Sequence, residues 1–194
     1  MEQLVLTNGK RIIVKKGDIT LETVDAIINP ANSKLIHGGG AAKAIALKGG
    51  LEIITQSKEI ITKIGYLPVG KAVITHGGSL PTKFVIHTVG PKMGEGDESN
   101  KLIKAVLNSL TLAELYNLRT VSMPAISSGI FGFPKYLCAE IILKTTYHFL
   151  MQPDIKLEAV TMCNHDEETY TFFENALDTI NPLTMDSNYL QEMT

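Results

Sequence analysis

Short hydrophobic runs and longer amphipathic stretches follow one another along this chain of 194 residues. Apolar runs bounded by Gly, Pro or Asn are typical of buried strands, whereas apolar residues three or four positions apart are typical of helices. The pattern predicts strands at 3–7, 11–15, 25–29, 71–75, 83–89, 120–123 and 156–163. It predicts helices at 41–48, 51–64, 99–116, 134–150 and 166–180.

Four local signals indicate where these elements begin and end. Asn8-Gly9-Lys10 separates the first two strands, and Asn-Gly is typical of a hairpin turn with two positive-φ residues. Pro30 is expected to end the strand at 25–29. Ser99 is expected to cap the helix that follows it, and Pro134 to open the next one.

Strands that alternate with helices of this length predict an α/β fold with a largely parallel central sheet. No low-complexity block or repeat divides the chain, so we expect a single domain at 1–181. Pro182 ends the last helical pattern, and 182–194 is expected to form a short C-terminal tail. In folds of this class, ligands bind in the loops that follow the strands.

Composition and charge narrow the function classes. Hydrophobic residues make up 44% and charged residues 20% of the chain, as in a soluble globular protein. The net charge of -2 disfavours a basic face for nucleic acid, and no segment is apolar enough to cross a membrane. Cys138 and Cys163 are too few for a disulfide scaffold or a cysteine-based metal site. Without a secretory signal, the expected location is cytoplasmic or nuclear.

The loop from Asn29 to Ala41 joins a predicted strand to a predicted helix and ends in three consecutive glycines. Glycine lets a backbone approach a ligand closely, and the N–H groups at a helix start favour anions. The loop is not a P-loop, because no Gly-Lys-Ser/Thr follows. A flexible turn is the alternative interpretation.

A second loop of this kind runs from Pro124 to Pro134. Ser127, Ser128 and Gly129 can present N–H and hydroxyl donors, and Phe131 can cover a sugar or base. The alternative is an ordinary turn with Phe131 in the core. Two donor-rich loops in one chain favour a phosphate-bearing ligand, and a diphosphate in particular.

A third loop, Lys16-Gly17-Asp18-Ile19-Thr20, places an acid directly after a strand. Asp18 can cap the following segment, or it can accept a hydrogen bond from an exocyclic amine such as that of adenine.

Five motifs in this order resemble the macro domain family over about residues 3–180. They are Gly-Asp-Ile-Thr at 17–20, Asn-Pro-Ala-Asn at 29–32, His-Gly-Gly-Gly-Ala-Ala at 37–42, His-Thr-Val-Gly-Pro at 87–91 and Pro-Ala-Ile-Ser-Ser-Gly-Ile-Phe-Gly at 124–132. The pattern is most similar to archaeal and viral members, with some features of the histone-variant branch. The resemblance implies a three-layer α/β/α domain with a mixed, mostly parallel sheet that binds ADP-ribose.

The resemblance also implies a role for individual residues. Asp18 would accept the adenine amino group, Ile19 would offer a backbone contact to the ring, and Asn32 would hold the distal ribose. Two sets would line the diphosphate and the distal ribose from opposite sides. These sets are Gly38, Gly39, Gly40 and Ala41 on one side, and Ser127, Ser128, Gly129, Ile130 and Phe131 on the other. Asn164 would also contact the ligand, because it lies where an adenine-stacking aromatic is often found in the family.

Many members of this family hydrolyse ADP-ribose esters, and others only bind. Ala42 stands where one hydrolase branch carries an Asp, whereas Asn32, His37 and Phe131 match the residues associated with hydrolysis in archaeal and viral members. The expected activity is removal of mono-ADP-ribose from acidic side chains, or deacetylation of O-acetyl-ADP-ribose, without metal or cofactor. The expected partners are ADP-ribose or mono-ADP-ribosylated proteins, and the expected state is a monomer.

Two alternatives stay open. Asn29-Pro30 and residues 80–87 are similar to the histone-variant branch, which binds without catalysis, so a non-catalytic ADP-ribose reader is the second hypothesis. His37 could order water, because the ordinary pKa of histidine lies near neutrality, or its side chain could hydrogen-bond to backbone and hold the shape of the loop.

Overall fold

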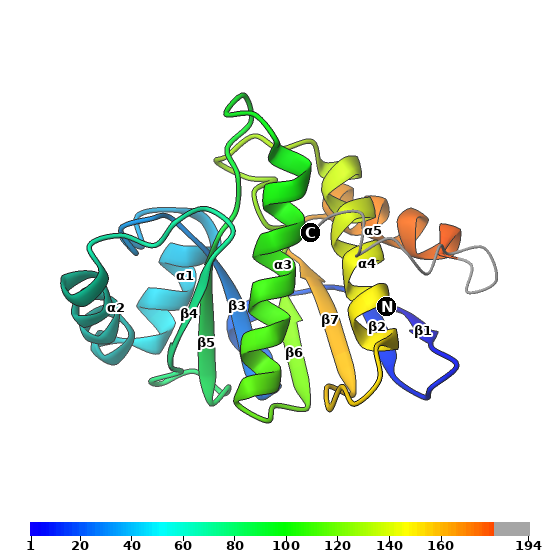
Figure 1. Ribbon diagram of the computed structural model, residues 1–194, viewed down its shortest axis with the longest axis horizontal. Helices are drawn as coiled ribbons and strands as arrows, with labels where there is room; N and C mark the ends of the chain where they lie inside the picture. The colour runs from blue at the N-terminus through cyan, green and yellow to red at the C-terminus, as the bar shows by residue number, and fades with distance from the viewer. Residues whose placement is uncertain (181–194) are drawn as a thin grey trace.

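The computed structural model describes residues 1–180, so the predicted tail at 182–194 lies outside the described residues. Figure 1 shows the arrangement of the elements. The strands are β1 (Glu2–Val5), β2 (Arg11–Lys16), β3 (Ala26–Ala31), β4 (Ala72–His76), β5 (Phe84–Val89), β6 (Thr120–Met123) and β7 (Ala159–Asn164). The helices are α1 (Gly40–Gly49), α2 (Leu51–Ile64), α3 (Glu98–Leu115), α4 (Lys135–Met151) and α5 (Glu167–Thr179), with a 3₁₀ turn at Ile19–Leu21.

One seven-stranded sheet carries the fold, with the strand order β1-β2-β7-β6-β3-β5-β4. The five strands from β2 to β5 in this order are parallel, whereas β1 and β4 pair antiparallel at the two edges. This mixed sheet between two helical layers confirms the predicted α/β/α fold. Because parallel strands end at the same edge, the loops after β2, β3, β6 and β7 are brought together there.

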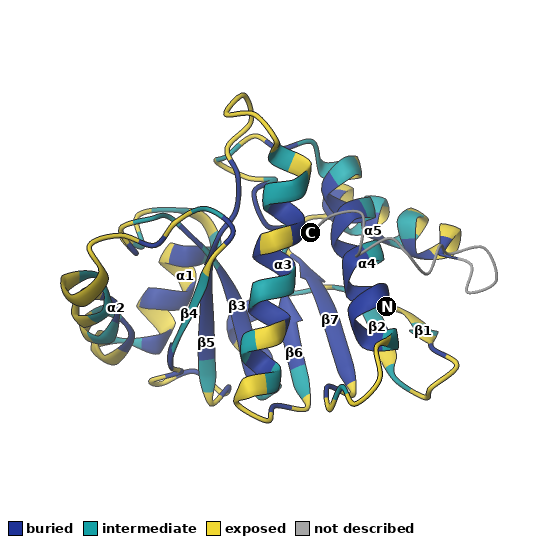
Figure 2. Ribbon diagram, in the orientation of Figure 1, coloured by how far each residue is buried: buried dark blue, intermediate teal, exposed yellow. Residues whose placement is uncertain are grey.

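The core lies on both faces of the sheet. Successive strand residues point to opposite faces, so Ile28 packs into the cluster formed with α3, α4 and α5, while Ile27 packs with residues of α1 and α2. In Figure 1, α3 and α4 cross the near face of the sheet. Figure 2 shows that the central strands are mostly buried and that exposure is concentrated on the loops and the outer helix faces. No helix within residues 1–180 is long and apolar enough to span a membrane.

The first hairpin forms as predicted, but its turn differs. Within this turn, Gly9 has a positive φ, of 82°, and Asn8 does not. The expected pair of positive-φ residues at Asn-Gly is therefore wrong. The Leu6 N–H donates to the Lys10 carbonyl at 2.8 Å, which leaves Thr7, Asn8 and Gly9 as the loop. A three-residue loop needs a left-handed residue only at its last position, and glycine provides it.

Pro30 lies inside β3 rather than after it. The strand pairs with β6 only at Ala26 and Ile27, whereas its pairing with β5 continues to Ala31. Pro30 therefore occupies a part of the strand that has a neighbour on one side only, where a missing N–H is tolerated.

Two other predicted boundaries shift because side chains hold the backbone. Asp97, with φ of 56°, precedes α3 in place of Ser99, and the Glu98 carboxylate accepts from the N–H groups of Gly94 and Gly96. Lys156 and Leu157 donate their N–H groups to the Glu114 carboxylate, so β7 begins at Ala159 and not at residue 156.

Candidate functional site

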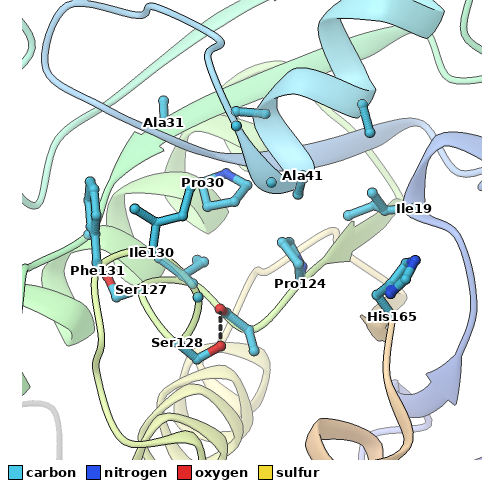
Figure 3. A pocket seen from close by; sticks show the side chains of 18 of the residues that line it. Ile19, Pro30, Ala31, Ala41, Pro124, Ser127, Ser128, Ile130, Phe131 and His165 are labelled. Carbon is cyan, nitrogen blue, oxygen red and sulfur yellow. Dashed lines mark hydrogen bonds between the residues drawn. The ribbon is translucent and has the colours of Figure 1, made fainter.

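A cavity of about 760 Å³ lies where the parallel strands end, between the loops after β2, β3, β6 and β7 (Figure 3). Every residue predicted to bind ligand lines it. They are Asp18, Ile19, Asn32, Gly38, Gly39, Gly40, Ala41, Ser127, Ser128, Gly129, Ile130, Phe131 and Asn164. The sequence therefore locates the cavity, while contact of each residue with a ligand stays a prediction.

Asn32 shapes the loop that leads to the glycines. Its Oδ1 accepts hydrogen bonds from the N–H groups of Lys34 at 3.1 Å and Ile36 at 3.0 Å, and its Nδ2 donates to the Ile36 carbonyl at 2.6 Å. Leu35 is buried with φ of 49°, a conformation that non-glycine residues rarely adopt. The Asn32 amide thus closes a tight turn and borders the cavity with the same side chain.

The glycine run brings a helix start to the cavity. Gly39 is the N-cap of α1, and Gly40, with φ of 54°, is its first residue. The first N–H groups of a helix have no intrahelical acceptor and carry partial positive charge. A Cβ at Gly39 would lie 2.9 Å from Cδ1 of Ile130, so the two loops nearly touch across the cavity.

The facing loop is held in an unusual backbone conformation. Ser127 has φ of 70°, its carbonyl accepts from Phe133, and its Oγ lies 2.1 Å from where a Cβ at Gly90 would be. Gly90 must lack a side chain for this loop to pack. Within residues 1–180 the backbone N–H groups of Gly129 and Ile130 make no hydrogen bond, so they can donate to an anion.

Asp18 and Ile19 form one end of the cavity. Asp18 Oδ1 accepts hydrogen bonds from the Thr20 hydroxyl at 2.7 Å and the Thr20 N–H at 2.9 Å, which lower the pKa of Asp18. The capping role is thus observed, and it engages Oδ1 only. Ile19 packs into the core beside Cys163. Phe131, at the far end, lies away from Ile19 in Figure 3.

Asn164 and Ser127 contribute buried polar atoms near the cavity. Both amide atoms of Asn164 and the Oγ of Ser127 have no hydrogen-bond partner within the described chain. Unpaired buried polar atoms are costly, and they concentrate at sites that bind a ligand or water.

His37 does not line the cavity, unlike the other two predicted catalytic residues, Asn32 and Phe131. Its imidazole lies within hydrogen-bond reach of Asn29 at 3.4 Å and of Ser57 in α2 at 3.0 Å. The side chain is therefore directed toward the sheet and α2, and its partners are side chains rather than the backbone groups that the shape-holding alternative expects.

Sequence reasoning missed several lining residues, of which His165 is the most informative. His165 is exposed and lies at the same end of the cavity as Ile19 (Figure 3). Its position directly after the last strand was the available signal, since an aromatic ring is often found there. The other missed residues include Pro30, Pro124, Ala125, Asp166 and Thr169.

The charges around the cavity are unusual for an anion site. No Lys or Arg is among the described lining residues, and the titratable ones, Asp18, Cys163, His165 and Asp166, all come from the ends of β2 and β7. Burial raises the pKa of Cys163 to about 12, so this thiol stays neutral and is no nucleophile at pH 7. The described residues contain no group of His, Cys, Asp or Glu that could hold a metal.

Fold and site together define a class: an α/β/α domain whose cleft offers backbone N–H groups from two facing loops to a phosphate-bearing ligand. The chain belongs to the macro domain family, since residues 28–142 match the family model described as Macro domain. This confirms the family predicted from the motifs.

Three relatives illustrate the likeness. The chain is 50% identical over 169 residues to an uncharacterized protein of Thermotoga maritima, covering 86% of this chain but only 28% of that protein. It is 41% identical to an O-acetyl-ADP-ribose deacetylase of Escherichia fergusonii, covering 86% of this chain and 95% of the relative. A variant of the Oceanobacillus iheyensis macrodomain solved with ADPR is 33% identical, with a TM-score of 0.81 over 94% of this chain and 93% of that one.

Proposed function

We propose that this chain binds ADP-ribose in the cleft and hydrolyses its carboxylate esters. The observation that carries the proposal is the pair of facing loops, because their backbone N–H groups supply diphosphate donors where the described lining has no Lys or Arg. The volume of about 760 Å³ suits a ligand of this size. The likeness to the Escherichia fergusonii O-acetyl-ADP-ribose deacetylase and to the Oceanobacillus iheyensis macrodomain solved with ADPR supports the same ligand.

The cavity has two chemically different ends, which sets the direction of the ligand. Asp18, Ile19 and His165 form an end with a hydrogen-bond acceptor and two flat or apolar surfaces, which suits adenine. Asn32 and Phe131 form the other end, which suits the distal ribose. The two N–H-rich loops lie between them, where the diphosphate would bind.

On a glutamate-linked ester, water adds its oxygen to C1″ of the distal ribose as the bond from C1″ to the ester oxygen breaks; the bonding electron pair leaves with the carboxylate, and the water proton passes to a diphosphate oxygen of the substrate. On O-acetyl-ADP-ribose, water adds its oxygen to the acetyl carbonyl carbon, the bond from that carbon to the ribose oxygen breaks, and the ribose oxygen takes up the water proton. The chain contributes orientation: Phe131 covers the ribose, and the two loops fix the diphosphate beside it. A carboxylate leaves readily, so the glutamate-linked ester requires little help from an acid.

A non-catalytic reader is the second candidate, and the placement of the titratable side chains favours it. All of those that line the described cavity lie at the Asp18 end, so neither Asn32 nor Phe131 has a general base beside it. A reader would use the same cleft without a productive water.

The two candidates are separated by incubating the full chain with a glutamate-linked mono-ADP-ribosylated protein and with O-acetyl-ADP-ribose. The hydrolase proposal expects release of ADP-ribose from either substrate, and loss of that release in Gly90→Ala, which displaces the Ser127 loop. Tight ADP-ribose binding without turnover would establish the reader instead. Absence of both binding and turnover would contradict the proposal as a whole.

A further inference from the structure

A chain of polar side chains runs beneath the glycine loop, outside the cavity. Thr75 Oγ1 lies 2.9 Å from His87 Nε2, and His87 Nδ1 lies 2.9 Å from Asn29 Nδ2. The same Asn29 nitrogen lies 3.4 Å from His37 Nδ1, and His37 Nε2 lies 3.0 Å from Ser57 Oγ. Three strands, α2 and the ligand loop are thereby joined through one buried amide.

The proton positions in this chain follow from counting donors. The Thr75 hydroxyl has a single proton, which it donates to the His76 carbonyl at 3.1 Å. The Asn29 Nδ2 that faces His87 Nδ1 can only donate, so His87 Nδ1 is an acceptor and the proton of His87 is on Nε2. Thr75 Oγ1 then accepts from His87 Nε2.

The second N–H of Asn29 is directed at His37, so His37 Nδ1 is also an acceptor. Its proton is then on Nε2, from which it donates to Ser57 Oγ. Both imidazoles are thus neutral and have the same tautomer. A proton added to either Nδ1 would face the Asn29 NH₂ group, donor against donor, and would break the connection.

The surroundings keep both rings neutral. Burial, followed by repulsion from His37, lowers the pKa of His87 to about 3, and burial lowers the pKa of His37. The neighbours of His37 are Asn29 on β3, His87 on β5 and Ser57 on α2, with the two rings 5.4 Å apart. His87 is the only one of these neighbours that titrates.

We propose that His37 is a positioning residue: its neutral Nε2–H tautomer, bound to Asn29 and Ser57, holds Gly38, Gly39 and Gly40 against the sheet, and protonation of the ring releases them. The inference rests on the proposed function for its effect on ADP-ribose, but the connection itself is a property of the free protein. Leu35 anchors the loop on the apolar side, within a cluster that includes Leu67 and Val89, and His37 anchors it on the polar side.

The first test needs no ligand. Full-length chain labelled with both ¹⁵N-histidine and ¹⁵N-glycine is expected to show His37 and His87 as neutral Nε2–H tautomers at pH 7.5. On acidification, the amide signals of Gly38 to Gly40 are expected to shift with the same midpoint as His37. An Nδ1–H tautomer at His37, or a titration of His37 that leaves the glycine amides unchanged, would overturn the proposal.

The second test compares two substitutions of His37. Asparagine places an acceptor near the position of Nδ1 but does not titrate, whereas alanine leaves one N–H of Asn29 without an acceptor while the other stays bonded to His87. We expect His37→Ala to raise the dissociation constant of ADP-ribose about tenfold, the size of one lost hydrogen bond, and His37→Asn to stay within about threefold of wild type. His37→Asn should also lose the pH dependence of binding below the His37 midpoint.

An acid–base role for His37 predicts a different result: His37→Asn and His37→Ala would lose turnover equally while binding ADP-ribose as wild type does, and the positioning role would then be wrong. If wild type binds no ADP-ribose, the proposed function fails, and the histidine spectra alone decide the present inference. Circular dichroism of both variants identifies a variant that has failed to fold, in which case the spectra of the wild type decide.

Discussion

Gly90 is the residue at which the absence of one side-chain atom shapes the cleft most directly. A Cβ there would lie 2.1 Å from Ser127 Oγ and 2.7 Å from Ile126 Cγ2. Both neighbours are buried, and Ser127 already has the rare φ of 70°. The strained backbone and the missing side chain therefore depend on each other.

We expect Gly90→Ala to displace the loop at 127–131, to weaken ADP-ribose binding more than tenfold and to lower the free energy of unfolding by about 1–3 kcal/mol. The double variant Gly90→Ala/Ser127→Ala removes the clashing hydroxyl and should recover part of both losses. Calorimetric titration and urea unfolding measure the two effects. Normal binding by Gly90→Ala would mean that the loop does not touch the ligand.

Asn32 is expected to act on binding as well as turnover, because its amide makes three hydrogen bonds within its own loop. Asn32→Asp keeps the acceptor for Lys34 and Ile36 but places a carboxylate oxygen against the Ile36 carbonyl and a negative charge at the cleft. Asn32→Ala should therefore weaken ADP-ribose binding by about tenfold relative to wild type, and Asn32→Asp should weaken it at least as much. Unchanged binding in Asn32→Ala would show that Leu35 and His37 suffice to order the loop.

At the scale of elements, Asp25 joins three strands at the end of the sheet opposite the cavity. Its carboxylate accepts hydrogen bonds from the N–H groups of Arg119 and Thr120 and from the Lys83 ammonium. Burial raises the pKa of Asp25, but these donors outweigh it and lower the pKa overall. The group thus stabilises the folded chain as a carboxylate.

Asp25→Ala leaves two strand-end N–H groups without an acceptor. We expect the free energy of unfolding to fall by about 1–3 kcal/mol, with ADP-ribose affinity unchanged, because Asp25 precedes β3 and the cavity follows it. Urea unfolding and calorimetric titration at pH 7.5 provide the comparison, and Asp25→Asn serves as the matched variant. A loss of affinity equal to that of Gly90→Ala would show that the two ends of the sheet are coupled.

For the whole molecule, His87 makes stability depend on pH. Its pKa falls from 6.5 to about 3 on folding, so the unfolded chain binds more protons between these values and acid favours unfolding. From this group alone, the free energy of unfolding should fall by up to about 1.4 kcal/mol for each pH unit below about 6.5. His87→Asn, which keeps an acceptor near Nδ1 but does not titrate there, should have a shallower slope in urea unfolding between pH 7.5 and 4.5. Equal slopes in both proteins would contradict a buried neutral His87.

The sequence predicts the strands, the helices and the loops of the cleft because these depend on local patterns: apolar runs, turn residues and glycines before a helix. It does not predict the direction of His37, because that depends on Asn29, Ser57 and His87, which come together only in the folded chain. The continuation of β3 through Pro30 likewise depends on its pairing with β5. The turn at Gly9 is set by local pairing between Leu6 and Lys10, which the Asn-Gly pattern alone does not specify.

The central claim is that the cleft binds ADP-ribose through backbone N–H groups rather than side-chain cations. Calorimetric titration of the full chain with ADP-ribose, at low and at moderate salt, tests it most directly. Since no Lys or Arg is among the described lining residues, we predict one site per chain, an affinity well above that for AMP, and a dissociation constant that changes less than about threefold with salt. No detectable binding, or a steep loss of affinity with salt, would contradict the account.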